Sequence, residues 1–314
     1  MAVYAFVFPG QGSQSVGMGQ DLAQAFPSAR AVFEEVDDAL GENLSKIIFE
    51  GPAESLTSTE NTQPALMAVS MAVLRVLENE GGLDLASTAT LLAGHSLGEY
   101  AALAAARSLG IAQTAKLLRP RGQAMQKAVP AGEGGMAALI GATLEQAEEI
   151  CAQSSKTALV EIANDNGGGQ IVLSGKMAGI DAAIALAKEM KIKRAVKLPV
   201  SAPFHSSLMK PAEAIMAEAL EQATIAAPVV PVIANVTAQR ETDADTIRKN
   251  LVQQVTGRVR WEESVRAMVE MGVDSFVEIG AGKVLSGLIR RIAPDVTTAS
   301  VGTPDDIEAF LKSL

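Results

Sequence analysis

The chain has 314 residues, of which 48% are hydrophobic and 20% are charged, and its formal net charge is −10. This length allows one large domain or two unequal ones, and the composition is that of a folded globular protein rather than a disordered one. The acidic balance and the aromatic content of 4% argue against a nucleic-acid partner, since such proteins need basic surfaces and aromatic stacking platforms.

Cysteine use and the N-terminal sequence bear on where the protein resides. Cys151 is the only cysteine in the sequence, so an internal disulfide and a four-thiolate zinc site are both excluded. The first segment lacks a basic stretch and its apolar run is cut by Pro9 and Gly10, which argues against a signal peptide. No stretch approaches the roughly 18–20 apolar residues of a membrane span. We therefore expect a cytoplasmic protein that has no membrane partner.

Apolar runs and helical periodicity alternate along the first part of the chain. The expected strands are residues 3–8 and 89–93, and the expected helices are residues 27–40, 63–80, about 98–106 and 111–129. Pro120 is expected to bend or break the last of these helices near its middle, because proline lacks a backbone N–H.

Residues 132–199 follow a different order, β-α-β-β-α-β, which is that of a ferredoxin-like unit. Gly132, Gly134 and Gly135 precede this unit and Pro199 follows it, so we interpret it as an inserted small subdomain. The expected elements are residues 136–140, 143–151, 158–163, 171–174, 178–190 and 194–198. The large domain would then consist of residues 1–131 plus 200–314.

The alternation of strands and helices resumes after the insert. We expect a helix from Ser207, a strand at 229–236, helices at 243–254 and 261–271, a strand at 275–279, a helix from Val284, and a final strand and helix. Strands that alternate with helices imply a parallel sheet that is covered on both faces. The sequence therefore predicts an α/β fold.

The segment Gly94-His95-Ser96-Leu97-Gly98 fits the pattern G-x-S-x-G between an apolar strand and an alanine-rich helix. This context is that of a nucleophile elbow, in which glycines relieve crowding around a strained serine. The serine would lie at a helix N-terminus, where free N–H groups and the helix dipole favour developing negative charge. The alternative is a plain glycine-rich turn into a helix.

A serine hydroxyl needs a base, and the sequence offers only two histidines. His95 is adjacent to Ser96 on a sharp turn, so its ring is expected to point away from the hydroxyl. His205 is then the candidate base, although a lone histidine in a loop is usually a surface residue. No Asp or Glu obviously orients His205, and a backbone carbonyl could do so while fixing its tautomer.

These residues belong to longer sequence motifs that are spread over essentially the whole chain. Through these motifs the chain resembles the malonyl-CoA:acyl carrier protein transacylases, the enzymes that load malonate for fatty-acid synthesis. The resemblance implies a hydrolase-like, parallel-sheet large domain that carries a ferredoxin-like insert. The matching strings are Phe8-Pro9-Gly10-Gln11-Gly12-Ser13-Gln14, Gly94-His95-Ser96-Leu97-Gly98-Glu99-Tyr100, Arg121-Gly122 with Met125, Gly169-Gln170 with Ser174-Gly175, Pro203-Phe204-His205-Ser206, and Glu278-Ile279-Gly280 with Gly282-Lys283-Val284-Leu285.

The resemblance implies a role for each matching site residue. Ser96 would be the acylated nucleophile, and His205 its general base and acid. Arg121 would pair with the free carboxylate of malonate, which a guanidinium can bind through two hydrogen bonds. The oxyanion hole would come from the backbone N–H groups of Gln11 and Leu97. The backbone carbonyl of Gln254 would orient His205.

Two loops bear on selectivity and on the limits of the resemblance. Phe204 resembles the malonyl-selecting form of its loop, in which a bulky ring would crowd the branched α-carbon of methylmalonate; the alternative is a packed aromatic residue. Where the family usually has Asn-Ser-Pro-Gly-Gln, this chain has Asn166-Gly167-Gly168-Gly169-Gln170. The departure predicts a more flexible loop, and we assign no site role to Asn164 or Asn166.

The implied reaction moves a malonyl group from coenzyme A to the phosphopantetheine thiol of acyl carrier protein through a malonyl-serine ester. It requires no metal and no cofactor, and we expect a monomer. Carrier proteins are acidic, so docking on this acidic chain needs a local basic region. The densest basic run could serve, or could merely blunt an exposed edge strand. It consists of Lys188, Lys191, Lys193, Arg194 and Lys197.

Three other interpretations stay open. A serine esterase or thioesterase would use the same elbow, although it has no need of Arg121. A stand-alone malonyl loader for a polyketide synthase would use the same chemistry as the fatty-acid enzyme. A non-catalytic interaction protein is disfavoured, because Ser96, His205 and Arg121 are all present.

Overall fold

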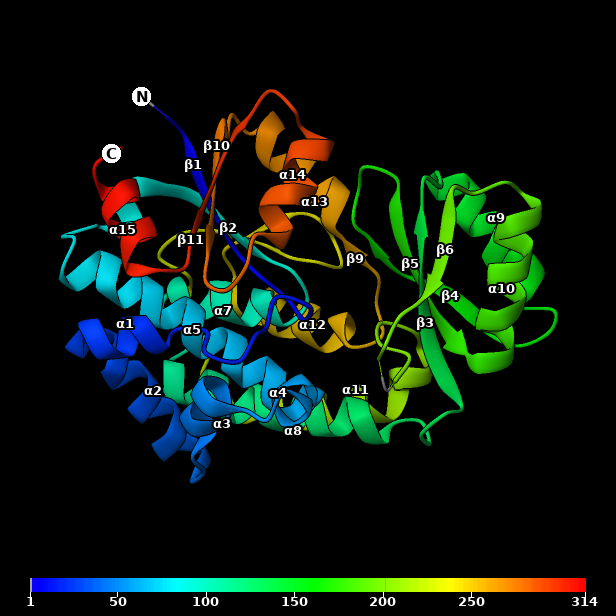
Figure 1. The fold of residues 1–314 in the computed structure, drawn as a ribbon, viewed down its shortest axis with the longest axis horizontal. Coiled ribbons are helices and arrows are strands. Elements are labelled where there is room, and N and C mark those ends of the chain that lie inside the picture. Colours follow the sequence, from blue (N-terminus) through cyan, green and yellow to red (C-terminus); the bar gives the residue numbers. More distant parts are fainter. Residues whose placement is uncertain (1, 201) are drawn as a thin grey trace.

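Two β-sheets organise the computed structural model, which describes residues 2–200 and 202–314 (Figure 1). The larger sheet has six strands in the order β11-β10-β1-β2-β7-β8, all parallel except β8, which runs antiparallel to β7. The prediction of an α/β fold is confirmed. The strands are β1 (Tyr4–Phe8), β2 (Ala89–Gly94), β7 (Val232–Ile233), β8 (Arg240–Glu241), β10 (Ser275–Ile279) and β11 (Thr297–Val301).

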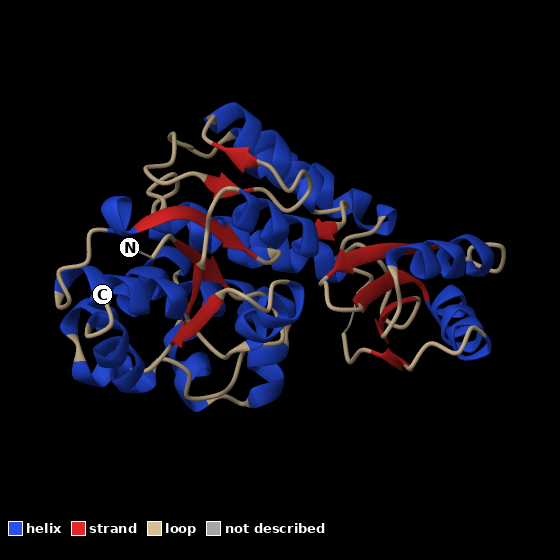
Figure 2. Cartoon of the chain, turned by 90° about the horizontal axis from the view of Figure 1, so that it is seen from above, coloured by secondary structure: helices blue, strands red, loops and turns tan. Residues whose placement is uncertain are grey.

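Helices cover both faces of this sheet (Figures 1 and 2). Successive side chains of a strand point to opposite faces, so Phe6 and Phe8 of β1 enter one core while Ala5 and Val7 enter another. The sheet therefore separates two hydrophobic cores. The helices of this part are α1 (Gln20–Ala25), α2 (Pro27–Leu40), α3 (Leu44–Glu50), α4 (Ala53–Thr57), α5 (Thr59–Asn79), α6 (Leu85–Thr88), α7 (Leu97–Ala105), α8 (Ile111–Lys127), α11 (Lys210–Glu221), α12 (Ala244–Gln254), α13 (Trp261–Glu270), α14 (Val284–Ile292), α15 (Pro304–Leu311) and the 3-10 helix η1 (Ser207–Met209).

A second sheet of five strands, in the order β6-β3-β5-β4-β9, lies beside the first (Figure 1). Helices α9 and α10 pack on it around a third core. Its last strand, β9 (Val259–Arg260), comes from outside residues 132–199 and pairs in parallel with β4. The C-terminal part of the chain thus completes the small sheet. The other elements are β3 (Gly134–Ile140), α9 (Leu144–Ser154), β4 (Val160–Asp165), β5 (Gln170–Lys176), α10 (Met177–Glu189) and β6 (Arg194–Lys197).

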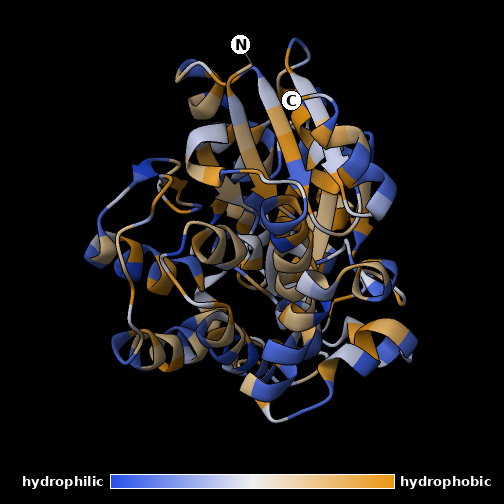
Figure 3. Ribbon diagram, turned by 90° about the vertical axis from the view of Figure 1, so that its left-hand side faces the viewer, coloured by the Kyte–Doolittle hydropathy of each residue, from blue (hydrophilic) through white to orange (hydrophobic). Residues whose placement is uncertain are grey.

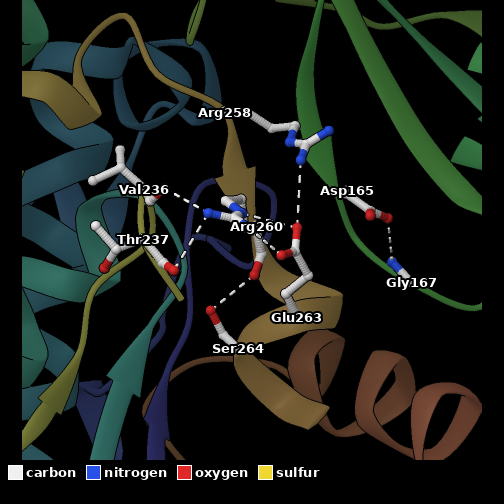
Figure 4. Close-up of polar contacts among 8 residues, drawn as sticks. All are labelled: Asp165, Gly167, Val236, Thr237, Arg258, Arg260, Glu263 and Ser264. Carbon is white, nitrogen blue, oxygen red and sulfur yellow. Dashed lines mark hydrogen bonds and ion pairs between the residues drawn. The ribbon is translucent and has the colours of Figure 1, made fainter. Parts of the chain in front are cut away.

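Charged side chains gather where β9 meets β4 (Figure 4). The Arg260 guanidinium donates to the backbone oxygens of Val236 and Thr237, each at 3.4 Å, and forms an ion pair with Glu263. Glu263 also pairs with Arg258, whose Nη2 lies 3.4 Å from Oε1. These bonds tie β9 to the segment after β7 and to the first turn of α13, so the strand is held between the two sheets.

Pro120 does not break its helix, which excludes one of the two outcomes expected from the sequence. It lies inside α8, a continuous helix of 17 residues. Helix α8 is buried along much of its length, and both neighbours of the proline, Arg119 and Arg121, are buried polar residues with hydrogen-bond partners. This packing outweighs the backbone hydrogen bond that proline cannot make.

The strand expected at 229–236 is much shorter than predicted. Only Val232 and Ile233 pair with β2. Pro228 and Pro231 have no backbone N–H, so the segment before β7 cannot extend the ladder on both sides. The strand therefore begins later than predicted, and a loop after β7 returns the chain to pair with it as β8.

Hydrophobic residues are concentrated in the layers between sheet and helices. Figure 3 shows them along the strands of the larger sheet, whereas many hydrophilic residues lie on the surrounding helices and loops. Within residues 2–200 and 202–314, no helix combines the length and the hydropathy that a membrane crossing requires.

Glu278 is a buried carboxylate in β10 that caps a helix. Its oxygens accept hydrogen bonds from the backbone N–H groups of Leu285, at 3.0 Å, and Ser286, at 2.8 Å. Both donors lie in the first turn of α14, where N–H groups have no partner within the helix and the dipole favours a negative group. Glu278 therefore fixes the start of α14 to the sheet.

Replacing Glu278 with alanine would leave two buried N–H groups without an acceptor. We expect Glu278→Ala to lower the free energy of unfolding by roughly 2–4 kcal/mol in denaturant titrations. Glu270→Ala removes an exposed carboxylate from the neighbouring helix α13 and is the matched control, with an expected change within about 0.5 kcal/mol. Equal losses in the two variants would contradict the capping role.

Candidate active site

Ser96 lies at the turn between β2 and α7 in a strained backbone conformation. Its φ is 54° and its ψ is −113°, a combination that residues other than glycine rarely adopt. A Cβ on Gly94 would lie 1.9 Å from the carbonyl oxygen of Gly98, and a Cβ on Gly98 would lie 2.2 Å from that of Phe8. The turn can therefore close only with glycine at both positions, which is the geometry of a nucleophile elbow.

Asn235, in the segment after the neighbouring strand β7, supports this turn. Its Oδ1 accepts from the backbone N–H of Ser96 at 2.7 Å, and its Nδ2 donates to the carbonyl oxygen of Gly94 at 2.7 Å. The sequence analysis missed Asn235. The strand expected at 229–236 placed Asn235 inside a strand, whereas β7 ends at Ile233 and leaves Asn235 in the loop at the carboxyl edge of the sheet, where ligand-binding residues of parallel sheets lie.

His205 lies opposite Ser96, with Nε2 at 2.7 Å from Ser96 Oγ. Its Nδ1 lies 2.9 Å from the carbonyl oxygen of Gln254 and 3.2 Å from that of Gly257. Carbonyl oxygens can only accept, so Nδ1 carries the proton and the Nε2 lone pair faces the serine hydroxyl. Backbone carbonyls thus supply the orientation that a carboxylate gives in a Ser-His-Asp triad.

The imidazole of His205 is held in its neutral form. Burial, followed by the positive charge of Arg121, lowers the pKa of His205 to about 3, although the carbonyl of Gln254 acts in the opposite sense. Because the ring is neutral at physiological pH, it can accept the proton of Ser96 without first losing one of its own.

Arg121, on α8, is a buried cation that has no carboxylate bonded to it. Its guanidinium donates to Gln63 Oε1 at 2.6 Å, to Gln254 Oε1 at 2.8 Å and to Ser96 Oγ at 3.3 Å. None of the ion pairs among the described residues involves it. Burial lowers the pKa of Arg121. A buried charge is costly unless it is paired, so the site suits a ligand that brings its own negative group.

A cavity of about 380 Å³ lies between the two sheets and brings these side chains together. The small sheet closes it with the apolar residues Met136, Ala138 and Val172. A cavity of this size and apolar character is typical of a small-molecule site. Of the residues to which the resemblance assigned a site role, those that line it are Gln11, Ser96, Leu97, Arg121, Phe204 and His205.

Gln254 is fully buried at the end of α12, outside the set of residues that line the cavity, and it contacts both His205 and Arg121. Its backbone oxygen accepts from His205, and its side-chain Oε1 accepts from Arg121. The resemblance implied the backbone contact alone. The side-chain contact was not foreseen, because it depends on how α12 approaches α8 in three dimensions, which spacing along the sequence does not reveal.

His95 points away from the Ser96 hydroxyl, as its place on the turn predicts. Its Nε2 lies 2.8 Å from Asn166 Oδ1, and its ring lies against Trp261, with centroids 5.7 Å apart. Asn164 and Asn166 line the cavity, so two residues to which the sequence analysis gave no role lie at the site. Asn166 joins the small sheet to the residue beside Ser96.

The chemistry available here is acyl transfer through a serine ester. A hydroxyl, its base and a guanidinium face one cavity, and within the described part of the chain no group of three or more His, Cys, Asp or Glu side chains could hold a metal ion. A substrate with a carbonyl at Ser96 and a carboxylate at Arg121 would satisfy all three groups.

Comparisons with known proteins agree with this geometry. The family model described as "Acyl transferase domain" matches residues 5–303. A malonyl CoA-acyl carrier protein transacylase from Bacillus subtilis (strain 168) is 45% identical over 100% of this chain and 98% of its own. The crystal structure of an acyl-carrier-protein-S-malonyltransferase from Bartonella henselae is 56% identical, with a TM-score of 0.97 over 99% of both chains. A malonyl-transacylase solved in complex with its type II PKS acyl-carrier protein is 40% identical, with a TM-score of 0.96 over 100% of both chains.

Gly98 is the sharpest test of the elbow. In Gly98→Ala the new Cβ must displace the end of β1 or the Ser96 turn, so we expect labelling of Ser96 by a serine-directed phosphonate to slow about 100-fold. Gly287→Ala also changes a helical glycine, but its Cβ would meet no atom within 4 Å, so labelling should stay within about twofold. Similar labelling of the two variants would contradict the steric argument.

Proposed function

Because this chain belongs to the acyl transferase domain family, we propose that it transfers a malonyl group from malonyl-CoA to the phosphopantetheine thiol of acyl carrier protein, in support of fatty-acid synthesis. The observation that carries the substrate assignment is the buried guanidinium of Arg121, 3.3 Å from the Ser96 hydroxyl and without a bonded carboxylate. A malonyl group has a carboxylate one methylene away from its thioester carbon. It can therefore reach Arg121 while its thioester meets Ser96.

In the first half-reaction, Nε2 of His205 takes the proton of Ser96 as Oγ attacks the thioester carbon. We assign the backbone N–H groups of Gln11 and Leu97 as donors to the resulting oxyanion, where losing one donor typically costs about 10²–10³ in rate. The C–S bond then breaks, and the proton on His205 passes to the departing sulfur of coenzyme A. A malonyl ester of Ser96 remains.

In the second half-reaction, the carrier's thiol gives its proton to His205 and attacks the ester carbon. Collapse of the second tetrahedral intermediate returns the proton to Oγ of Ser96 and releases the malonyl carrier. The backbone oxygens of Gln254 and Gly257 hold the Nδ1 proton in both steps. Bonds and protons balance with these residues alone, so the proposal includes no metal and no cofactor.

The substrate carboxylate would also change the basicity of His205. After burial, the positive charge of Arg121 is the largest cause that lowers the pKa of His205. A carboxylate paired with Arg121 would offset that charge and raise the pKa of His205 toward its ordinary range. An acetyl group would leave the guanidinium unpaired and the base weak. Selection for malonyl would thus act on chemistry as well as on binding.

Phe204 would act on the other end of the acyl group. It is nearly buried, lines the cavity and directly precedes His205. A methyl branch on the α-carbon would have to fit beside its ring, and well-packed walls tolerate an added methyl poorly. We therefore assign Phe204 a part in rejecting methylmalonyl groups.

We further propose that the protein works as a monomer in the cytoplasm, with coenzyme A as its leaving group. Ser96, His205, Arg121 and the two assigned oxyanion donors all line one cavity. Cys151 is a buried free thiol, which suits a reducing compartment.

A malonyl loader for polyketide synthesis is the second candidate. It is favoured by the similarity to the malonyl-transacylase that was solved with a type II PKS acyl-carrier protein. The two candidates share the chemistry at Ser96 and differ in the acceptor. Competition between a fatty-acid carrier and a polyketide carrier for the malonyl enzyme would separate them.

Intact mass after brief incubation with malonyl-CoA tests the proposed reaction. We expect one malonyl group on the protein, none on Ser96→Ala, and transfer of the group to phosphopantetheinylated carrier. Acetyl-CoA and methylmalonyl-CoA should give little adduct. Arg121→Lys loses the two-bond contact with the carboxylate, so acylation by malonyl-CoA should slow about 100-fold.

Arg119→Lys is the matched control, because Arg119 is buried on the same helix but pairs with Glu42 at 2.7 Å. Its acylation rate should stay within about threefold of the native protein. If no adduct forms and malonyl-CoA is rapidly hydrolysed, the protein is a serine hydrolase and not a transferase.

The basic run at the edge of the small sheet is the proposed docking region for the acidic carrier. Lys191, Lys193 and Arg194 are exposed, and β6 is the edge strand. Lys197 differs, because its Nζ pairs with Asp181 at 2.7 Å. Lys191 and Lys193 are therefore the more available charges, and reversing them should weaken long-range attraction to an acidic partner.

Lys191→Glu with Lys193→Glu should raise the KM for carrier about tenfold and leave the KM for malonyl-CoA unchanged. Added salt should shrink the difference. Lys46→Glu with Lys116→Glu, at exposed positions on α3 and α8, makes the same change in net charge and should have little effect. If both double variants behave alike, the basic run serves only to blunt the edge strand.

A further inference from the structure

Glu99 is a buried carboxylate beneath the Ser96 turn that the proposed reaction does not use. It lies on α7, three residues after Ser96, and is 2% exposed. Its Oε2 accepts from the side-chain Nε2 of Gln254 at 2.6 Å and from the backbone N–H of Asn235 at 3.1 Å. Gln254 holds Arg121, and Asn235 holds Ser96. One carboxylate therefore supports both halves of the site.

The contact with Glu99 decides which way the Gln254 amide faces. Its Nε2 donates to Glu99 and to the backbone oxygen of Ser96, at 2.6 and 3.0 Å, so both of its hydrogens face acceptors. Its Oε1 is then left to accept from Arg121 at 2.8 Å. In the reverse orientation the amide would present N–H groups to a guanidinium and its oxygen to a carboxylate, and both contacts would be repulsive.

Glu99 also stabilises the positive charge of Arg121. The guanidinium is bonded to neutral amide oxygens, and the negative charge of Glu99 acts on it across Gln254 without bonding to it. The cation is thereby stabilised while it stays open to another carboxylate. A direct ion pair, such as the pair that Arg119 makes with Glu42, would occupy it instead.

We propose that Glu99 is a positioning residue for malonyl selection: its carboxylate fixes the Gln254 amide, and the Gln254 amide fixes the Arg121 guanidinium where the malonyl carboxylate must bind. This inference rests on the proposed function. Loss of the Glu99 carboxylate should slow acylation by substrates that bind Arg121 and should not affect substrates that do not bind it. A role confined to supporting the Ser96 turn would instead reduce acylation by every substrate to the same extent.

The pH dependence has a defined sign. Burial raises the pKa of Glu99 to about 7, against its hydrogen bonds and the charge of Arg121, while the carboxylate of Glu241 acts with burial. Tyr100, the other titratable group beside it, has its own pKa raised to about 12 by burial and stays neutral. Above about pH 7 Glu99 is ionised and accepts from Gln254. Below it, the protonated carboxyl loses part of this acceptor capacity and releases the amide.

The experiment compares acylation of Ser96 by malonyl-CoA and by acetyl-CoA in Glu99→Gln. We expect kcat/KM for malonyl-CoA to fall about tenfold, through both KM and kcat, because the contact between the malonyl carboxylate and Arg121 holds the substrate and also offsets the charge that weakens His205 as a base. Acylation by acetyl-CoA should change by less than about twofold. The preference for malonyl should therefore fall about tenfold.

The preference of the native protein should also decline as the pH falls through 7, and this decline should be absent in Glu99→Gln. Titration of the coenzyme A phosphates affects both substrates and cancels in the ratio. Glu278→Gln is the matched control, since Glu278 is equally buried and also accepts two hydrogen bonds but caps α14. It should lower stability and leave the preference unchanged.

Each other outcome overturns the inference. An unchanged or increased preference in Glu99→Gln, or an equal loss for both substrates, would show that Glu99 does not position Arg121. If Glu99→Gln does not fold, the native protein provides the test. A preference for malonyl over acetyl that does not change with pH would also show that Glu99 does not position Arg121. Failure of the native protein to form a malonyl adduct would instead overturn the proposed function itself.

Discussion

The buried guanidinium of Arg121 is the constraint on which the rest of the site depends. Two amide oxygens, from Gln63 and Gln254, orient it without neutralising it. Arg119, two residues earlier on the same helix, is also buried but carries its own anion in Glu42. The charge of Arg119 is therefore paired within the protein, whereas the charge of Arg121 remains available to pair with a ligand.

The fold supplies the remaining groups by bringing strand ends to one edge of a parallel sheet. The loop after β1 brings Gln11, the turn after β2 brings Ser96, and the segment after β7 brings Asn235. Binding at the carboxyl edge is the rule for sheets of this kind. The small sheet then closes the cavity with apolar side chains, which exclude water and strengthen the electrostatic interactions inside.

Local features of the site could be predicted from the sequence, whereas contacts between distant segments could not. The elbow is encoded by glycines four residues apart, and the orientation of His95 follows from its place on the turn. The neighbours of Arg121 come from α5 and α12, which no spacing along the chain relates to α8.

The same distinction explains two features of the elements that the sequence did not reveal. Pro120 remains in a helix because tertiary burial outweighs propensity, and β9 joins the small sheet although its residues lie far from residues 132–199. The loop Gly167-Gly168-Gly169 also departs from the family pattern in its backbone conformation. All three residues have positive φ, which proline cannot adopt, so the family's proline would not fit this loop conformation.

The pairing of β9 with β4 has a mechanical consequence. Gly257, whose carbonyl faces Nδ1 of His205, is only two residues from Val259, which pairs with Asn164 of the small sheet. Asn166, the first residue after that strand, reaches back to His95 beside the nucleophile. A rotation of the small sheet away from the large one would therefore pull on the base and on the nucleophile's neighbour together. A hinge between the two sheets would run through the catalytic pair, so we expect the sheets to keep their relative position when a large thioester enters.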